Sequence, residues 1–578
     1  MEQALREEGL SGAVWALVEP GRTYVNGAGH SDARSAAPMR PDHRVQVGSV
    51  GKVVLAVGIL RLVTEGRLSL ETPVTELLPE LPLTNAWSRT DPVRVKHLLA
   101  HTAGLDHSRF WQVFSLEPTP DTPLIESVRG DSALLRVQSR PGSRYAYSNV
   151  GYALLGMIVE SVTGARYEHY LDEQVLAPLG MNDSTFRFVT QTGPHGDRRL
   201  AMGHFEKGAP QAAVPMYLRP AGQFTTTAAD MARLARFLMG DGAIDGEPFV
   251  APALTRALGE PLGTEASLAG LSIGHGLALA GRDRHGVYGW CHPGTTIGFV
   301  AMFCVYPEHG RAFFVGTNTD SETADYDRLN RLLIASLSMP GRPKKIERAS
   351  APPPDVEAWN GFYVQVPRAM SSLAWIDDLF NFVRAEWDGR VLRLSTLQAD
   401  ERVLEPVGAG RLFRAADRDG PSHVLLVGPD GKRVISDGLH SYERTSLARL
   451  VFGWTSTAVG LLGLGYVFIV GAVRTLRRQR SRHDPLFIPF IGVLALALPI
   501  PLFLGQSFLQ LGDRTAASLA LATVTAVLPA TLVIGMVRQA KALRGSVSGV
   551  IDLTMLAAAL QWLVVLAAAG LVPFRLWQ

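Results

Sequence analysis

The sequence predicts three structural units: a mixed α+β domain over residues 1–340, a small all-β domain over 355–445, and four transmembrane helices within 450–572. Three observations support this division. Strand-like and helix-like apolar runs occur together in the first part, short alternating runs between turns recur in the second, and long apolar stretches fill the third. At 578 residues the chain is also longer than one ordinary domain.

Charge and cysteine content narrow the classes of function. The net charge is only +3 and the basic residues before residue 340 form no single run, so nucleic acid is not expected as a partner. Two cysteines, Cys291 and Cys304, are too few for a disulfide framework or a Cys-rich zinc site. A hairpin that turns near Thr295 and Thr296 would place Cys291 opposite about residue 300, so we expect two buried thiols and no bridge. No metal-ligand spacing is apparent, and we expect neither a metal nor a cofactor.

The first candidate site follows an N-terminal pair of strands. Apolar runs at 11–18 and 22–27 flank a Glu-Pro-Gly turn, which indicates a strand, a turn and a strand. An apolar helix then begins after Ser49 and ends at Gly66. Residues three apart share a helix face, so Ser49 and Lys52 stand side by side, and a desolvated lysine can remove a serine proton. The alternative is a serine that caps the helix and a solvated lysine.

The second candidate site lies on a turn before another helix. Two short helices are expected between residues 68 and 100, and the second ends on the loop His101–Leu105. Further along, Tyr147 and Asn149 lie two residues apart before an apolar helix at 153–162, so both can project into one cleft. A lysine ammonium nearby would lower the pKa of the tyrosine and make it a proton shuttle. An ordinary aromatic turn with an Asn cap is the alternative.

The third candidate site is a predicted hairpin. Residues 287–306 read as a strand, a turn and a second strand, with His292, Gly294 and Gly298 near the turn. Glycines there let the backbone approach a ligand closely, and the strand edge can offer an amide N–H to an oxyanion. A satisfied structural histidine is the alternative for His292.

The three sites together resemble one family. Ser49-x-x-Lys52, Tyr147-x-Asn149 and His292-x-Gly294, in this order, resemble the motifs of serine hydrolases related to class C β-lactamases, D-aminopeptidases and penicillin-binding DD-peptidases. The resemblance covers about residues 8 to 340. Secondary matches support it: Leu98–Leu105, Pro220–Gly222, Thr225–Ala232 and Gly274–Leu277.

The resemblance implies a fold and a set of roles. The fold is an antiparallel sheet flanked by helices, with a mostly helical subdomain inserted. Ser49 would attack a carbonyl, Lys52 and Tyr147 would share the proton transfers, and Asn149 would orient Lys52 and the substrate. Backbone N–H groups of Ser49 and Thr295 would form the oxyanion hole. Thr295 lies on the predicted hairpin that carries His292 and Gly294.

One departure from the family pattern bears on the substrate. Many β-lactamases and transpeptidases have Lys-Thr-Gly where this chain has His292-Pro293-Gly294. A largely neutral histidine binds a substrate carboxylate less strongly than a lysine near pH 7. This favours a peptidase, amidase or esterase over a dedicated β-lactamase. The acidic residue that class A enzymes use for deacylation has no obvious counterpart, so Tyr147 is the candidate to activate the deacylating water.

Composition separates the second unit from the first. Residues 341–354 are rich in proline and charge, which predicts an extended linker. Short alternating runs then recur between turns, at 361–364, 391–395, 403–406 and 424–427. This pattern is similar to the barrel-like modules that follow some members of the family, and it contains no catalytic signature. A spacer or a lid between enzyme and membrane is the working hypothesis.

Four apolar stretches, at about 450–473, 486–505, 516–537 and 551–572, approach or exceed the roughly 20 residues that span a bilayer. Prolines at 489, 499 and 501 are expected to kink the second. The first and third connecting loops hold eight basic residues, namely Arg474, Arg477, Arg478, Arg480, Arg482, Arg538, Lys541 and Arg544.

The positive-inside rule makes these two loops cytoplasmic and the soluble part extracytoplasmic, periplasmic or external. Residues 1–8 show no basic segment followed by an apolar one, so no signal peptide is apparent. We give the loop charges more weight than the lack of an apparent signal peptide, because eight basic residues on one side of the membrane need an explanation. They favour a soluble part outside the cytoplasm.

The sequence therefore favours a membrane-anchored serine hydrolase that acts on small peptides, amides or esters, including bonds next to D-residues, with the lipid bilayer as its second partner. Three alternatives remain: a peptidase that removes an acylated D-amino-acid leader from a secreted natural product, a carboxylesterase, and a non-catalytic sensor or scaffold with the same fold.

Overall fold

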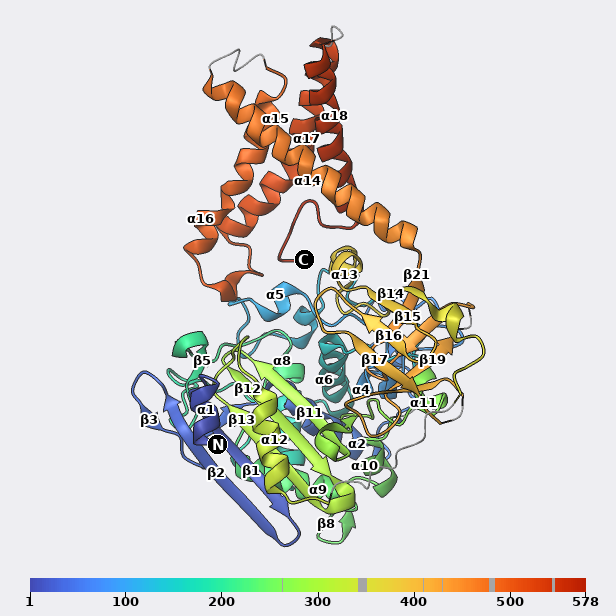
Figure 1. Cartoon of the computed structure of the whole chain (residues 1–578). Helices are drawn as coiled ribbons and strands as arrows, with labels where there is room; N and C mark the ends of the chain where they lie inside the picture. The colour runs from blue at the N-terminus through green and yellow to red at the C-terminus, as the bar shows by residue number, and fades with distance from the viewer. Residues whose placement is uncertain (262, 341–350, 409, 429, 478–483, 543–545) are drawn as a thin grey trace.

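The computed structural model contains an α+β domain, a closed β-barrel and four long C-terminal helices, which confirms the predicted fold class (Figure 1). It describes all residues except 262, 341–350, 409, 429, 478–483 and 543–545. Most of the predicted linker, 341–350, therefore lies outside the described residues.

The α+β domain is built on a seven-stranded antiparallel sheet of order β10-β11-β12-β13-β1-β2-β3. Its strands are β1 Gly12–Glu19, β2 Arg22–Asp32, β3 Ala37–Pro38, β10 Ala280–Arg282, β11 Gly289–Thr296, β12 Phe299–Tyr306 and β13 Arg311–Thr317. Because β1 pairs with β13, the two ends of this domain meet in the middle of the sheet. Short strand pairs lie outside it: β4 Val45–Gln46 with β7 Thr225–Thr226, β5 Gly203–Phe205 with β6 Ala209–Gln211, and β8 Ala243–Ile244 with β9 Glu247–Pro248.

Helices cover both faces of the sheet. On one face α1 (Glu2–Glu7) and α12 (Tyr326–Ser336) bury their apolar side chains against β12 and β13. On the other face α2 (Gly51–Thr64) and α9 (Ala228–Met239) share a core with inward residues of β1. The helical subdomain contains α3 Val74–Leu77, α4 Val95–Leu99, α5 Phe110–Val113, α6 Asn149–Thr163, α7 Tyr167–Leu171, α8 Arg219–Gly222, α10 Pro252–Ala257 and α11 Glu265–Leu268.

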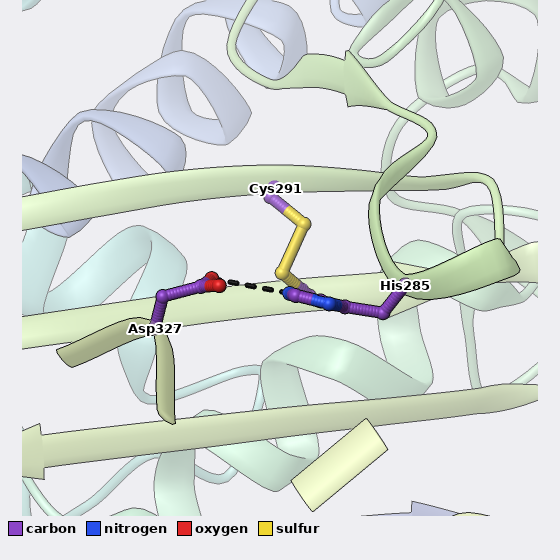
Figure 2. Close-up of a disulfide and its surroundings, with 4 residues drawn as sticks. His285, Cys291 and Asp327 are labelled. Atoms are coloured by element: carbon purple, nitrogen blue, oxygen red, sulfur yellow. Dashed lines mark hydrogen bonds and ion pairs between the residues drawn. A yellow bond between two sulfur atoms is a disulfide. The ribbon is translucent and has the colours of Figure 1, made fainter. Parts of the chain in front are cut away.

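Cys291 and Cys304 form a disulfide, so the expectation of two thiols was wrong (Figure 2). The turn of the β11–β12 hairpin lies between Thr296 and Phe299, later in the chain than predicted, and this register places the two cysteines directly opposite each other. Gly298, with φ 77°, provides the left-handed turn residue. Both cysteines are buried on the face covered by α12, where Figure 2 shows the contact of His285 with Asp327, 3.1 Å long, beside them.

The second unit is a closed eight-stranded barrel, in which the last strand pairs with the first. Its strands are β14 Gly361–Gln365, β15 Val383–Trp387, β16 Leu392–Ser395, β17 Arg402–Pro406, β18 Leu412–Ala415, β19 His423–Val427, β20 Arg433–Ser436 and β21 Ser441–Thr445. The aromatic side chains of Trp359, Tyr363 and Phe413 fill its interior. A short helix, α13 (Ala374–Phe380), lies between β14 and β15 and contacts the first C-terminal helix.

Four C-terminal helical segments are long and apolar enough to cross a membrane: α14 Leu447–Leu476, the segment Phe487–Leu504, α17 Ala516–Ala542 and α18 Val547–Ala568. The second segment consists of α15 (Phe487–Leu494) and α16 (Pro499–Leu504), separated by a 3-10 turn just before Pro499. Four of the eight basic loop residues, Arg478, Arg480, Arg482 and Arg544, lie outside the described residues.

Candidate active site

Ser49 and Lys52 lie in contact at the start of α2. Ser49 belongs to a 3-10 turn, Gly48–Val50, that runs directly into the helix. The Nζ atom of Lys52 donates to Ser49 Oγ at 2.8 Å and to the carbonyl oxygen of Ala221 at 2.7 Å. Lys52 is fully buried, and burial holds its pKa well below the ordinary value. Its two hydrogen-bond partners in the described part of the chain are uncharged, so the neutral amine is favoured and can act as a base.

Two glycines bring the Ser49 turn against strand β11. Gly48 has φ 50°, and a Cβ atom on it would lie 2.5 Å from the Thr295 carbonyl oxygen. A Cβ atom on Gly294 would lie 2.0 Å from the Val47 carbonyl oxygen. Only hydrogen atoms fit at both positions, so the two backbones touch. The chain segments of Ser49 and Thr295, predicted to supply the oxyanion hole, are therefore adjacent, and Thr295 is exposed.

Tyr147 completes the contact with Ser49. It precedes α6, whose N-cap Ser148 accepts a hydrogen bond from the Gly151 N–H at 2.9 Å. The Tyr147 hydroxyl hydrogen-bonds to Ser49, and its ring centre lies 5.0 Å from Lys52 Nζ. Burial raises the pKa of Tyr147, and the hydrogen bond to Ser49 offsets this only in part. The expected lowering of that pKa was wrong, because it required a lysine ammonium nearby, whereas burial favours the neutral forms of both Lys52 and Tyr147. A Tyr147 phenol that keeps its proton can donate it.

Asn149 faces a histidine rather than Lys52. Its Nδ2 atom lies 3.3 Å from Nε2 of His107, and its backbone N–H donates to the His107 carbonyl at 3.0 Å. The Oδ1 atom of Asn149 is buried and has no partner in the described residues. Burial, and to a lesser degree Lys52, lowers the pKa of His107 to about 4, so its imidazole is neutral. One signal for His107 was present in the sequence: it lies just after the loop His101–Leu105.

His292 belongs to a cluster of three buried histidines. One ring nitrogen each of His101, His275 and His292 lies within 4.8 Å of the others. In every ring Nδ1 bonds to the backbone, which leaves Nε2 buried and unpartnered within the described structure. His101 and His275 were part of secondary motif matches, but their convergence on His292 required the fold.

The backbone contacts fix the tautomers of this cluster. The Ser148 N–H donates to Nδ1 of His101 at 3.0 Å, so His101 has its proton on Nε2. His275 and His292 donate from Nδ1 to carbonyl oxygens at 2.6 Å, so each has a lone pair on Nε2. The cluster offers one N–H and two lone pairs, which matches one water molecule. A metal ion needs a lone pair from every ligand, so the three rings do not fit one. Burial lowers the pKa of all three.

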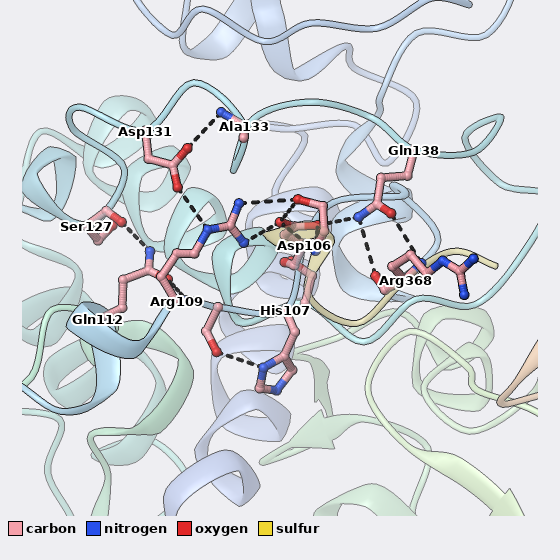
Figure 3. Close-up of polar contacts among 12 residues, drawn as sticks. Asp106, His107, Arg109, Gln112, Ser127, Asp131, Ala133, Gln138 and Arg368 are labelled. Atoms are coloured by element: carbon pink, nitrogen blue, oxygen red, sulfur yellow. Dashed lines mark hydrogen bonds and ion pairs between the residues drawn. The ribbon is translucent and has the colours of Figure 1, made fainter. Parts of the chain in front are cut away.

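The barrel reaches directly into the loop that carries His107 (Figure 3). Asp106 is buried and binds Arg109 and Gln138, and Ser371, from the segment after β14, donates to it at 2.6 Å. The Ala369 carbonyl of the same segment accepts the His107 N–H at 2.8 Å. The barrel is thus attached to the active-site loop, which gives it a structural connection to the site beyond a spacer.

The chain is similar in sequence and in fold to known proteins. A family model described as Beta-lactamase matches residues 1–337. The chain is 29% identical over 383 residues to penicillin-binding protein 4 of Amycolatopsis lactamdurans, over 62% of this chain and 95% of that protein. It is 35% identical over 197 residues to esterase EstB of Burkholderia gladioli, over 32% of this chain and 49% of EstB. The crystal structure of SurE is similar in fold, with a TM-score of 0.53 at 22% identity, over 77% of this chain and 97% of that one.

Proposed function

The chain belongs to the β-lactamase family, and we propose that it is a serine hydrolase that cleaves an amide or ester bond through an acyl-enzyme on Ser49. One observation carries the proposal: Lys52 is fully buried, bonded to uncharged partners and 2.8 Å from Ser49 Oγ. A structural lysine would be exposed or paired with a carboxylate, whereas a desolvated one is poised to take a proton.

Acylation follows from the contacts. The Ser49 hydroxyl proton passes to the lone pair of Lys52 Nζ as Oγ bonds to the substrate carbonyl carbon. The negative charge on the carbonyl oxygen is stabilised by the backbone N–H groups of Ser49 and Thr295, whose chain segments meet at the glycine contact. The bond to the leaving group then breaks, and the leaving atom takes the hydroxyl proton of Tyr147. The Lys52 ammonium gives its proton to the Tyr147 oxygen, which restores the neutral phenol and the neutral amine.

Deacylation uses the same groups in reverse. A water molecule takes the place of the leaving group and gives a proton to the Tyr147–Lys52 pair as it attacks the acyl carbon. Collapse of the second tetrahedral intermediate returns a proton to Ser49 Oγ and releases the acid. Each half-reaction ends with neutral Lys52 and protonated Tyr147, the states that burial favours.

Substrate class is inferred from His292 and from the relatives. Burial and the proximity of Lys52 lower the pKa of His292, so it is neutral at pH 7 and offers no fixed positive charge for a substrate carboxylate. The named relatives include a penicillin-binding protein and an esterase. An amide, peptide or ester that does not depend on a carboxylate contact fits both observations.

We further propose that the enzyme is anchored in a membrane with this domain outside the cytoplasm. Four apolar helices support the anchor. The basic residues of the first and third helix loops support the orientation. The Cys291–Cys304 disulfide supports it independently, because structural disulfides persist mainly in oxidising compartments.

A labelling experiment tests the enzyme proposal. The purified protein is treated with a fluorescent fluorophosphonate, and Ser49→Ala is the control. We expect labelling of the wild type and none of Ser49→Ala. Labelling that persists in Ser49→Ala, or that is absent from a folded wild type, would refute the proposal. A screen of D-Ala-D-Ala peptides, acyl-D-amino-acid peptides, nitrocefin and short esters would then identify the bond.

A further inference from the structure

Residues 106–117, here called the His107 loop, are held from two sides by parts of the chain outside the α+β domain. Its first residues bind the barrel segment through Ser371 and Ala369, as described above. Its last residues contact the connection between the second and third apolar helices, residues 505–515. We call this connection the membrane loop. It is distant from the His107 loop in sequence: Ser115 and Asp513, which are hydrogen-bonded, are 398 residues apart.

The contact with the membrane loop is polar and specific. Asp513 is buried, with 7% of its surface exposed, and it accepts hydrogen bonds from the Ser115 hydroxyl and, at 3.1 Å, from the Leu116 N–H. The Gly512 N–H donates to the Phe114 carbonyl at 2.7 Å. A buried carboxylate is costly unless such donors satisfy it, so these contacts form as a set.

Apolar contacts surround this polar set. The ring of Phe508 lies 6.2 Å from that of Phe114 and 5.1 Å from that of Phe205, measured between centroids. A Cβ atom on Gly512 would lie 2.2 Å from the Cα atom of Trp111, which is backbone and cannot rotate away. The membrane loop and α5 are therefore in direct backbone contact.

The His107 loop connects these contacts to the reaction site. His107 binds Asn149, and its ring centre lies 5.4 Å from that of Tyr147. At the far end Trp111 packs edge-on against Tyr217 at 5.0 Å, and Tyr217 reaches Glu117 at 3.5 Å. A shift of this loop would move the His107 imidazole, which lies beside both Asn149 and Tyr147.

We propose that the membrane loop is a positioning element of the active site, with Gly512 and Asp513 fixing the His107 loop and so the fit of the acyl substrate. This inference rests on the proposed hydrolase function. It assigns the helical region a role in substrate recognition in addition to anchoring. Because the catalytic triplet of Ser49, Lys52 and Tyr147 lies on other elements, loss of the contact should impair substrate binding far more than the chemical step.

Gly512→Ala in the full-length protein, in detergent or nanodiscs, tests the inference. The φ angle of Gly512 lies outside the left-handed range, so the new methyl group acts through its clash with Trp111. The matched control is Gly465→Ala in α14, where a Cβ atom meets nothing within 4 Å. With short p-nitrophenyl esters we expect Gly512→Ala to raise KM about tenfold and to change kcat less than about twofold. Amide hydrogen exchange across 106–117 should become faster, and Gly465→Ala should match the wild type in every measurement.

Asp513→Asn is the second variant, for the case that Gly512→Ala does not fold. It keeps the size of the side chain and removes the charge that accepts two hydrogen bonds. We expect KM to rise, but by less than in Gly512→Ala. Wild-type exchange rates in 106–117 together with unchanged KM in both folded variants would overturn the inference. A wild type without Ser49-dependent labelling would instead overturn the proposed function, and the exchange measurement would still decide whether the membrane loop fixes the His107 loop.

Discussion

Lys52 Nζ lies 2.8 Å from Ser49 Oγ and donates a second hydrogen bond to the uncharged carbonyl oxygen of Ala221. The ring centres of Tyr147 and Tyr152 lie 5.0 Å and 5.4 Å from Nζ, and the Lys52 side chain is fully buried, so its pKa falls well below the ordinary value. This single relationship determines the protonation state of the base, the pH dependence of the reaction and part of the stability of the domain.

The first prediction concerns pH. Protonated Lys52 cannot accept the serine proton, so kcat/KM should fall as pH drops through the lowered pKa of Lys52 and stay flat above it. His107 and His275 have pKa values of about 4 and are neutral at higher pH. A fall in kcat/KM that occurs above about pH 4 therefore reports the protonation of Lys52. A pH–rate profile on a p-nitrophenyl ester measures this. Lys52→Arg, which keeps its charge, should lose most activity at every pH; an active Lys52→Arg would contradict the role.

The second prediction concerns stability. The unfolded chain keeps the Lys52 proton up to the ordinary pKa, whereas the folded chain releases it at lower pH, so unfolding free energy rises with pH between these two values. Lys52→Met keeps the volume and removes this cost. At pH 7 we expect a higher Tm, by about 2–4 °C for each kcal/mol gained, together with loss of labelling. Thermal unfolding at pH 7 and pH 9 measures it, and a Tm below that of the wild type at both would refute the burial argument.

The third prediction concerns Tyr147. Its phenol keeps its proton and hydrogen-bonds to Ser49, so Tyr147→Phe removes a proton donor and leaves the ring contacts in place. We expect kcat to fall by about 10²-fold or more, with Tm within a few degrees of the wild type. Steady-state kinetics and thermal unfolding measure the two effects. A kcat near that of the wild type would assign the proton transfer to Lys52 alone.

Local patterns predicted the parts of this protein that depend on neighbours in sequence. The spacing of Ser49 and Lys52 placed both side chains on one turn, and hydropathy located the four apolar helices. Tyr147 lies just before a helix as expected, but this helix begins at Asn149 rather than near residue 153, so Asn149 belongs to it. Each of these features is set within about one or two turns of chain, where periodicity and turn chemistry are informative.

The remaining features depend on residues that are distant in sequence. A turn located slightly too early was enough to separate Cys291 from Cys304, because hairpin register follows the turn. The pKa of Tyr147 depends on burial by other elements, and the imidazoles of His101, His275 and His292 meet only in the folded chain. The contact of Asp513 with Ser115 had no signal in the sequence beyond a single acidic residue in a short loop.

The fourth prediction concerns the histidine cluster. The Ser148 N–H bonded to His101 Nδ1 excludes the tautomer that a metal would need. We therefore expect no stoichiometric zinc in the purified protein and no loss of ester hydrolysis after dialysis against 1,10-phenanthroline. Elemental analysis and activity before and after dialysis measure this. One zinc per chain that is lost together with activity, and lost again in His275→Ala, would show that the tautomers rearrange around an ion.

The fifth prediction concerns the disulfide. Cys291 and Cys304, separated by 13 residues, tie together β11 and β12, and β11 carries His292, Gly294 and Thr295. Closing a loop of this size removes entropy from the unfolded chain, so Cys291→Ser/Cys304→Ser should lower the unfolding free energy of the α+β domain by about 2–4 kcal/mol. Chemical denaturation measures the loss. In protein from freshly lysed cells, denatured in the presence of a maleimide, the reagent should label the cysteines only if the protein has first been reduced. Labelling after denaturation without reduction would show that the cysteines are free thiols and would remove the disulfide as support for an extracytoplasmic domain.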